Sequence, residues 1–171
     1  LCLDGESWGG GPGGGGGGRY PEPRNDHEGE LALISGKKAK HGPKSEALNS
    51  VAAYSIALDI TIRGTEDRSF RKSPDSYTVL GPWLVTRDEV ADPQHLALRL
   101  MVNGQRVQAA NTDGMINGVA TLVSYLSRVS RLQPGDLIAT GNPDAPEFQR
   151  PLAPGDVLAA EIDGIGVLQV G

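Results

Sequence analysis

The chain has 171 residues and a formal net charge of −5 at neutral pH, and this length suffices for one domain with a hydrophobic core. The negative charge argues against a nucleic-acid-binding surface, and no apolar run approaches the roughly 18 residues that a membrane span needs. The single cysteine, Cys2, excludes an internal disulfide framework and a cysteine-based zinc site. A reducing, cytoplasmic setting is therefore the default expectation.

Residues 1–18, LCLDGESWGGGPGGGGGG, contain ten of the chain's 24 glycines. Such a stretch cannot bury enough apolar surface to offset the entropy of ordering it. It formally contains G-x-G-x-x-G, but no strand-like run precedes it and no helical pattern follows it, so we reject a dinucleotide-binding loop. We expect a flexible glycine-rich segment over 1–18 and one domain over 19–171.

The stretch DHEGELALISG predicts a strand over residues 29–36 with two glutamates at its start. Side chains alternate between the faces of a strand, so Glu28 and Glu30 point the same way. Two carboxylates so close repel each other unless a cation lies between them, and hard divalent cations prefer carboxylate oxygens. For an isolated pair, a solvated edge strand is the more common explanation.

The next pattern, residues 45–54, has apolar residues at helical spacing and predicts a short helix. Residues 55–63, SIALDITIR, predict a strand that carries Asp59 among apolar neighbours. Aspartate is almost never buried alone. Asp59 is therefore either tied to backbone amides or a third oxygen ligand beside the glutamate pair, in a site that suits Mg2+ or Mn2+.

The second half of the chain shows clearer patterns. Asn103-Gly104, flanked by alternating residues, predicts a hairpin over 96–111. Residues 116–130 predict an amphipathic helix with Ile116, Val119, Ala120, Val123, Leu126 and Val129 on one face. Residues 134–141 and 154–170 predict strands, each opened by a Pro-Gly-Asp turn. Many strands with one or two helices indicate a β-rich α+β fold, a roll or sandwich.

Six segments carry a family resemblance, in order from residue 24 to the C-terminus: DHEGELALISGK, YSIALDITIRG, FRKSPDSYTVLGPWLVT, VNGQRVQAANT, LSRVSRLQPGDLIATGNP and LAPGDVLAAEIDGIG. They resemble the C-terminal catalytic domain of the fumarylacetoacetate hydrolase family, and within it the bacterial 2-hydroxyhepta-2,4-diene-1,7-dioate isomerase type. The resemblance implies a mixed β-sandwich roll, usually as a homodimer. It also implies a bound Mg2+, Mn2+ or Ca2+.

The resemblance also implies roles for particular residues. The family's metal ligands fall on Glu28, Glu30 and Asp59. Its active-site lysine falls on Lys72 and a substrate-contacting arginine on Arg63. Two further substrate contacts, a glutamine and a threonine in the family, fall on Glu66 and Asn142.

The implied substrates are small 2-oxo or enol acids, including dicarboxylic acids from aromatic catabolism, and no nucleic acid or membrane is expected as a partner. Isomerisation or decarboxylation needs the fewest catalytic groups beyond those identified in this chain, so we expect it slightly ahead of the alternatives. The first alternative is hydrolysis of the C–C bond of acylpyruvate- or fumarylacetoacetate-like β-diketones. The second is an inactive metal-binding homologue. Departures from the family pattern favour that second alternative. They are Glu66, Asn142 and the glycine tract, which stands where many family members carry a His/Glu pair.

Overall fold

The computed structural model describes residues 24–143 and 151–171, so the expectation for residues 1–18 lies outside the described residues. The described strands form two four-stranded sheets and a small two-stranded one, and every pairing in them is antiparallel. The predicted β-rich α+β fold is confirmed. None of the helices in the described part of the chain has the length and apolarity to cross a membrane.

The first sheet has the order β5-β3-β2-β8. Its strands are β2 (Gly29–Ser35), β3 (Val51–Asp59), β5 (Thr78–Thr86) and β8 (Leu137–Ala139). The central strands β2 and β3 are buried along almost their whole length. This burial explains why they read as near-continuous apolar runs rather than as alternating ones.

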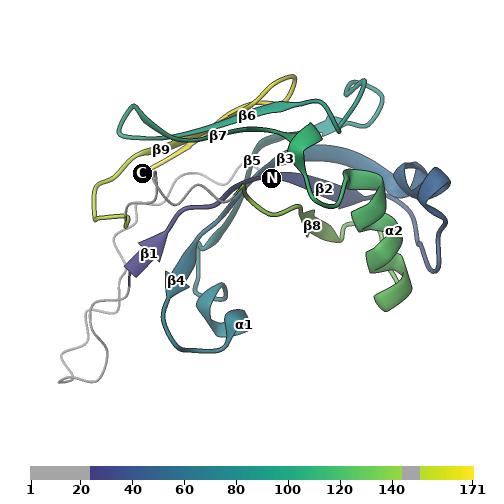
Figure 1. The fold of residues 1–171 in the computed structure, drawn as a ribbon, viewed down its shortest axis with the longest axis horizontal. Helices are drawn as coiled ribbons and strands as arrows, with labels where there is room; N and C mark the ends of the chain where they lie inside the picture. The colour runs from purple at the N-terminus through teal and green to yellow at the C-terminus, as the bar shows by residue number, and fades with distance from the viewer. Residues whose placement is uncertain (1–23, 144–150) are drawn as a thin grey trace.

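The second sheet has the order β10-β9-β6-β7. Its strands are β6 (Ala97–Val102), β7 (Gln105–Asn111), β9 (Leu158–Ile162) and β10 (Gly166–Val170). Strands β6 and β9 alternate between buried and half-buried residues, as expected of strands with one face on the core. Figure 1 shows β6, β7 and β9 as a layer over β2 and β3. Leu31 and Leu33 of the first sheet and Leu100 and Ile162 of the second belong to one core cluster of the described residues.

The remaining elements are short. The two-stranded sheet joins β1 (Arg24–Asp26) to β4 (Thr61–Arg63). In the described part of the chain, the helices are the 3-10 helices η1 (Lys44–Ser50) and η2 (Thr112–Gly114) and the α-helices α1 (Arg68–Arg71) and α2 (Val119–Val129). Helix α2 packs against η1 at one end of the molecule (Figure 1).

The predicted turns are confirmed. Asn103 and Gly104 have φ values of 52° and 77°, and positive values at both positions are what a type I′ hairpin requires. Gly135 and Gly155 of the two Pro-Gly-Asp turns have φ values of 91° and 87°, which glycine adopts without steric cost. The turns precede β8 and β9 as the sequence predicted, but β8 is shorter than the strand expected over 134–141. The single strand expected over 154–170 is wrong, because this range forms two antiparallel strands, β9 and β10, that pair with each other.

Other boundaries also differ from the prediction. The strand expected over 55–63 is divided between β3 and β4, which belong to different sheets. The helix expected over 45–54 ends at Ser50, because Ala53 and Tyr54 pair with β2 as part of β3. The helix expected from residue 116 begins at Val119, whose amide donates to the Gln94 side chain at 2.8 Å. Ile116 precedes that helix and is fully exposed, and Val129 is 67% exposed, so neither joins the buried face.

Candidate metal centre

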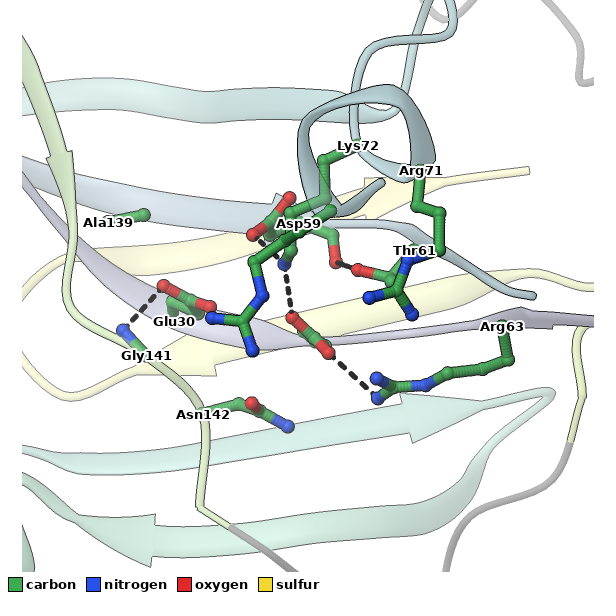
Figure 2. A pocket seen from close by; sticks show the side chains of 11 residues that line it. Glu30, Asp59, Thr61, Arg63, Arg71, Lys72, Ala139, Gly141 and Asn142 are labelled. Carbon is green, nitrogen blue, oxygen red and sulfur yellow. Dashed lines mark hydrogen bonds and ion pairs between the residues drawn. The ribbon is translucent and has the colours of Figure 1, made fainter. Parts of the chain in front are cut away.

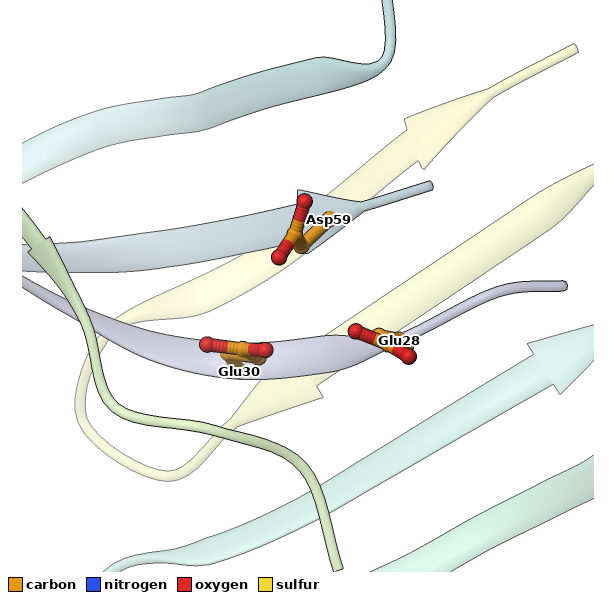
Figure 3. Close-up of side chains that lie close together, drawn as sticks. All are labelled: Glu28, Glu30 and Asp59. Carbon is orange, nitrogen blue, oxygen red and sulfur yellow. The ribbon is translucent and has the colours of Figure 1, made fainter. Parts of the chain in front are cut away.

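The pairing of β2 with β3 brings three carboxylates to one face of the first sheet. Glu30 lies opposite Ala57, and the Asp59 amide donates to the Glu28 carbonyl at 2.9 Å. Residues directly opposite in an antiparallel pair share a face, as do residues two apart on one strand. Glu28, Glu30 and Asp59 therefore project together, as Figure 3 shows.

This face is the one turned away from the second sheet. A Cβ atom added to Gly29 would lie 3.5 Å from the Cβ atom of Leu100 on β6 and 3.3 Å from the Gln108 side chain on β7. Gly29 thus faces the core between the sheets, and its two neighbours face the opposite way. The missing side chain of Gly29 lets the second sheet approach closely behind the glutamates.

The three carboxylates lie close enough to share one cation. One oxygen from each lies within 4.8 Å of the others, and Glu28 and Glu30 are only 6% and 3% exposed. Burial is the main cause that raises the pKa of Glu30 to about 7, and the nearby Asp59 and Glu28 raise it further. A hydrogen bond from the Gly141 amide to Glu30 Oε2, at 2.7 Å, opposes this shift. Three hard oxygen donors at this spacing fit a divalent cation such as Mg2+, Mn2+ or Ca2+.

Two cationic side chains border the carboxylates. Lys72 Nζ donates to Glu28 Oε2 at 2.7 Å and also to Asp59 Oδ2. Burial lowers the pKa of Lys72, but the hydrogen bonds to Asp59 and Glu28 outweigh it and raise that pKa above its ordinary value. Arg63 donates through Nε to Asp26 at 2.8 Å and through a terminal nitrogen to Glu28 at 2.9 Å.

Asp26 holds Arg63 in this arrangement. Its side chain is buried and accepts hydrogen bonds from Arg63 and from Arg24, the latter at 2.7 Å. Burial raises the pKa of Asp26, but the two guanidinium groups outweigh burial and hold it below its ordinary value. Asp26 therefore stays ionised and fixes the orientation of Arg63.

A cavity of about 370 Å3 opens over these groups. In Figure 2, Arg63 and Arg71 reach toward the carboxylates from one side, and Gly141 and Asn142 lie on the other. The cavity is lined by Glu28, Glu30, Asp59, Thr61, Arg63, Arg68, Arg71, Lys72, Ala139, Gly141 and Asn142.

The structure thus gathers six of the seven residues predicted for the site. Glu66 is the exception, because it is not among the residues that line the cavity. A Cβ atom added to Gly64 would lie 2.0 Å from Glu66 Oε2, so the Glu66 side chain folds back over its own loop. The roles of all seven residues stay predictions.

Sequence reasoning missed other residues around the site. Asp26 precedes Glu28 by two positions, so the period that paired the glutamates would have included it. Arg68 and Arg71 are three apart near Lys72, and this helical spacing was a usable signal. Gly141 acts through its backbone amide, and Gln108, from a distant hairpin, holds the Gly29 backbone from the core side. Neither carries a local signal in the sequence.

Comparison with known proteins identifies similar chains. The chain is 50% identical over 151 residues to a maleylpyruvate hydrolase of Aquipseudomonas alcaligenes, covering 88% of this chain and 52% of that protein. It is 40% identical over 147 residues to a 4-hydroxyphenylacetate degradation bifunctional isomerase/decarboxylase of Salmonella dublin, covering 83% of this chain and 34% of that protein. The chain thus spans about half, or less, of the length of these relatives.

A solved structure is similar as well. Maleylpyruvate hydrolase from Sphingobium sp. SYK-6, in complex with manganese(II) and pyruvate, superposes with a TM-score of 0.82 at 36% identity. The match covers 88% of this chain and 55% of that one. The family model described as fumarylacetoacetate (FAA) hydrolase C-terminal matches residues 15–170. The chain therefore belongs to the fumarylacetoacetate hydrolase family.

Proposed function

We propose that this chain is the catalytic domain of a divalent-metal-dependent hydrolase that cleaves the C–C bond of an acylpyruvate. Water adds to the acyl carbonyl carbon, the bond from that carbon to C3 of the pyruvate unit breaks, and its electron pair goes to the pyruvate enol. The products are a carboxylic acid and pyruvate. The observation that carries the proposal is the meeting of three carboxylates and Lys72 in one cavity.

The proposed ligands are Glu28, Glu30 and Asp59, with Mg2+ or Mn2+ as the cation and Ca2+ as a substitute. When bound, the cation would supply a Lewis acid that binds and polarises a 2-oxo acid. Lys72 borders the ligands and is 29% exposed on its side chain, so its ammonium can reach a substrate in the cavity. There it would donate a hydrogen bond to the oxygen that becomes negative as the enol forms.

Arg63 and Asn142 are proposed to line the substrate site, and Arg63 also holds Glu28 in place. Glu66 lies outside the cavity lining, so its proposed substrate contact would require its side chain to turn.

Hydrolysis is placed before isomerisation because the relative at 50% identity is named a hydrolase and the isomerase/decarboxylase relative is 40% identical. Isomerisation or decarboxylation of a 2-hydroxyhepta-2,4-diene-1,7-dioate type of acid is the second candidate. The same enol leads to both reactions, and the carboxylate cluster and Lys72 serve either.

The experiment supplies maleylpyruvate to the Mn2+-loaded protein and measures pyruvate through NADH oxidation by added lactate dehydrogenase. We expect metal-dependent pyruvate release that Glu30→Gln abolishes. The control variant Glu46→Gln alters an exposed carboxylate on η1 and should keep the wild-type rate. Substrate isomerised without pyruvate release would favour the second candidate. A substrate left intact by all preparations would favour an inactive metal-binding homologue.

We also propose, from the family resemblance, that the protein is a cytoplasmic homodimer. Light scattering coupled to size-exclusion chromatography tests the oligomeric state, and a monomer at micromolar concentration would contradict it.

A further inference from the structure

The side chains that line the cavity carry more positive than negative charge. Its lining has four cationic side chains and three carboxylates, an excess of one positive charge that a divalent cation would raise to three. A monoanionic 2-oxo acid would leave two of these charges unmatched. The excess therefore favours a substrate with a further negative charge.

Two of the four cations are already engaged. Lys72 is shared between Glu28 and Asp59, and Arg63 is held by Asp26 and Glu28. Within residues 24–143 and 151–171, neither Arg68 nor Arg71 forms an ion pair with a carboxylate within 4 Å, although both line the cavity.

Arg71 also has a buried hydrogen-bond donor without an acceptor. Its Nε atom is inaccessible to solvent, yet no residue of the described chain accepts a hydrogen bond from it. A buried unpaired donor costs free energy unless a ligand or water satisfies it. Figure 2 shows the Arg71 side chain on the same side of the cavity as Thr61 and Arg63, with its guanidinium beside Thr61.

The short helix α1 sets the spacing of the two arginines. Asp67 caps the helix by accepting a hydrogen bond from the Ser69 amide at 2.8 Å. Residues three apart on a helix share a face, so Arg68 and Arg71 project together while Phe70 between them is 61% exposed. A guanidinium group matches the planar, bidentate geometry of a carboxylate.

We propose that Arg68 and Arg71 bind a second carboxylate of the substrate, other than the one beside its 2-oxo group, and so select 2-oxo dicarboxylates over 2-oxo monocarboxylates. This inference rests on the proposed function for the 2-oxo acid end of the substrate. Arg63, which two carboxylates already hold, is not needed for this contact.

The test uses two uncleavable probes of equal chain length, 2-oxoadipate and 2-oxohexanoate, which differ only in the distal carboxylate. Binding to the Mn2+-loaded protein is measured by calorimetry, so no turnover is needed. Wild type should bind 2-oxoadipate about 10- to 100-fold more tightly, the range expected for a charge-assisted, bidentate contact. Arg68→Gln and Arg71→Gln should each reduce this preference, and the double variant should remove it with no change for 2-oxohexanoate.

Arg71→Lys keeps the positive charge but loses the planar guanidinium that can donate two hydrogen bonds to one carboxylate. It should therefore retain only part of the preference for 2-oxoadipate. The control Arg106→Gln changes an exposed arginine on β7 outside the cavity and should bind both probes as wild type does. Equal binding of the two probes, no binding of 2-oxoadipate, or an undiminished preference in the double variant would overturn the inference. A protein that prefers 2-oxoadipate but releases no pyruvate from acylpyruvates would overturn the proposed hydrolysis alone.

Discussion

Lys72 Nζ donates a hydrogen bond to Glu28 Oε2 over 2.7 Å, so the ammonium lies against a carboxylate that is also a proposed metal ligand. The same ammonium contacts Asp59, a second proposed ligand. In the metal-free protein Lys72 therefore supplies positive charge that the cation would otherwise provide. A divalent cation and Lys72 compete for the same oxygens.

This competition predicts opposite effects of Lys72→Met on metal binding and on catalysis. Mn2+ affinity should stay the same or rise, because a competing cation is removed and lysine is no ligand for such ions. The rate of pyruvate release should fall on the order of 100- to 1,000-fold, as when one preorganised donor is lost. Calorimetry and the coupled assay measure the two effects. Lys44→Met, at an exposed lysine, is the control. Weaker Mn2+ binding by Lys72→Met would contradict the prediction.

The raised pKa of Glu30 predicts that metal binding depends on pH. Below a pKa of about 7 the carboxyl group holds a proton that the cation must displace. The apparent Mn2+ affinity should therefore fall by about tenfold per pH unit as the pH drops from 7 toward 5.5. Titrations at three pH values in one buffer series check this. An affinity that stays constant from pH 5.5 to 8 would show that Glu30 is ionised throughout.

The same shift predicts how the stability of the metal-free protein depends on pH. The pKa of Glu30 is about 7 in the folded state against 4.5 in the unfolded chain, so folding favours its protonated form. This contribution is fully present below pH 4.5 and is lost as the pH rises to about 7, a loss of up to about 3 kcal/mol. Glu30→Gln, which cannot ionise, should gain stability relative to wild type between pH 5 and pH 8 in urea unfolding with chelator. An equal difference at both pH values would contradict the shift.

Local patterns predicted the elements that depend on local chemistry. The hairpin at Asn103-Gly104 and the two Pro-Gly-Asp turns need positive φ at defined glycines. The glycines themselves are the signal for these turns in the sequence. The pairing of Glu28 with Glu30 followed from the period of a strand alone. The predicted boundaries of strands and helices were wrong where contacts with residues distant in the sequence determine them. The residues before 55 join β3 because β2 lies beside them, and α2 starts where Gln94 caps it.

The site shows the same division. Asp59 was recognised because an aspartate in an apolar strand is unusual, but its distance from the glutamates depends on the register of β2 and β3. The resemblance to a known family supplied Lys72, Arg63 and Asn142. No pattern indicated Gly141, since a backbone amide has no residue type. Only the folded chain shows that it hydrogen-bonds Glu30.

Asp26 is expected to support the site without touching the cation. In Asp26→Asn the buried side chain loses the charge that pairs with Arg24 and Arg63, and both partners are partly exposed, so we expect destabilisation of about 2 kcal/mol. Because Arg63 also holds Glu28, Mn2+ affinity should fall by roughly 10- to 100-fold, as for other partners of metal ligands.

Chemical denaturation and calorimetry measure the effects of Asp26→Asn. The matched control is Asp163→Asn, which removes an exposed carboxylate 3.2 Å from Arg99 and should cost less than about 1 kcal/mol. If both variants bind Mn2+ as wild type does, Arg63 does not depend on Asp26 to position Glu28.

Gln108 is the residue that fixes the backbone between the two glutamates. Its amide accepts a hydrogen bond from the Gly29 N–H at 3.1 Å and donates to the Gly29 carbonyl at 2.6 Å, and it is 4% exposed. The ladder between β2 and β8 covers only Ala32–Ile34, so a side chain from the other sheet satisfies the peptide groups of Gly29.

Gln108→Met keeps the approximate volume but leaves this buried donor and acceptor unpaired. The expected cost is about 3 kcal/mol of unfolding free energy. Mn2+ affinity should fall as well, because Glu28 and Glu30 flank Gly29. Gln105→Met, at an exposed position of the same hairpin, should change neither quantity. A Gln108→Met protein that unfolds at the wild-type urea concentration would show that water or a shifted strand replaces both hydrogen bonds.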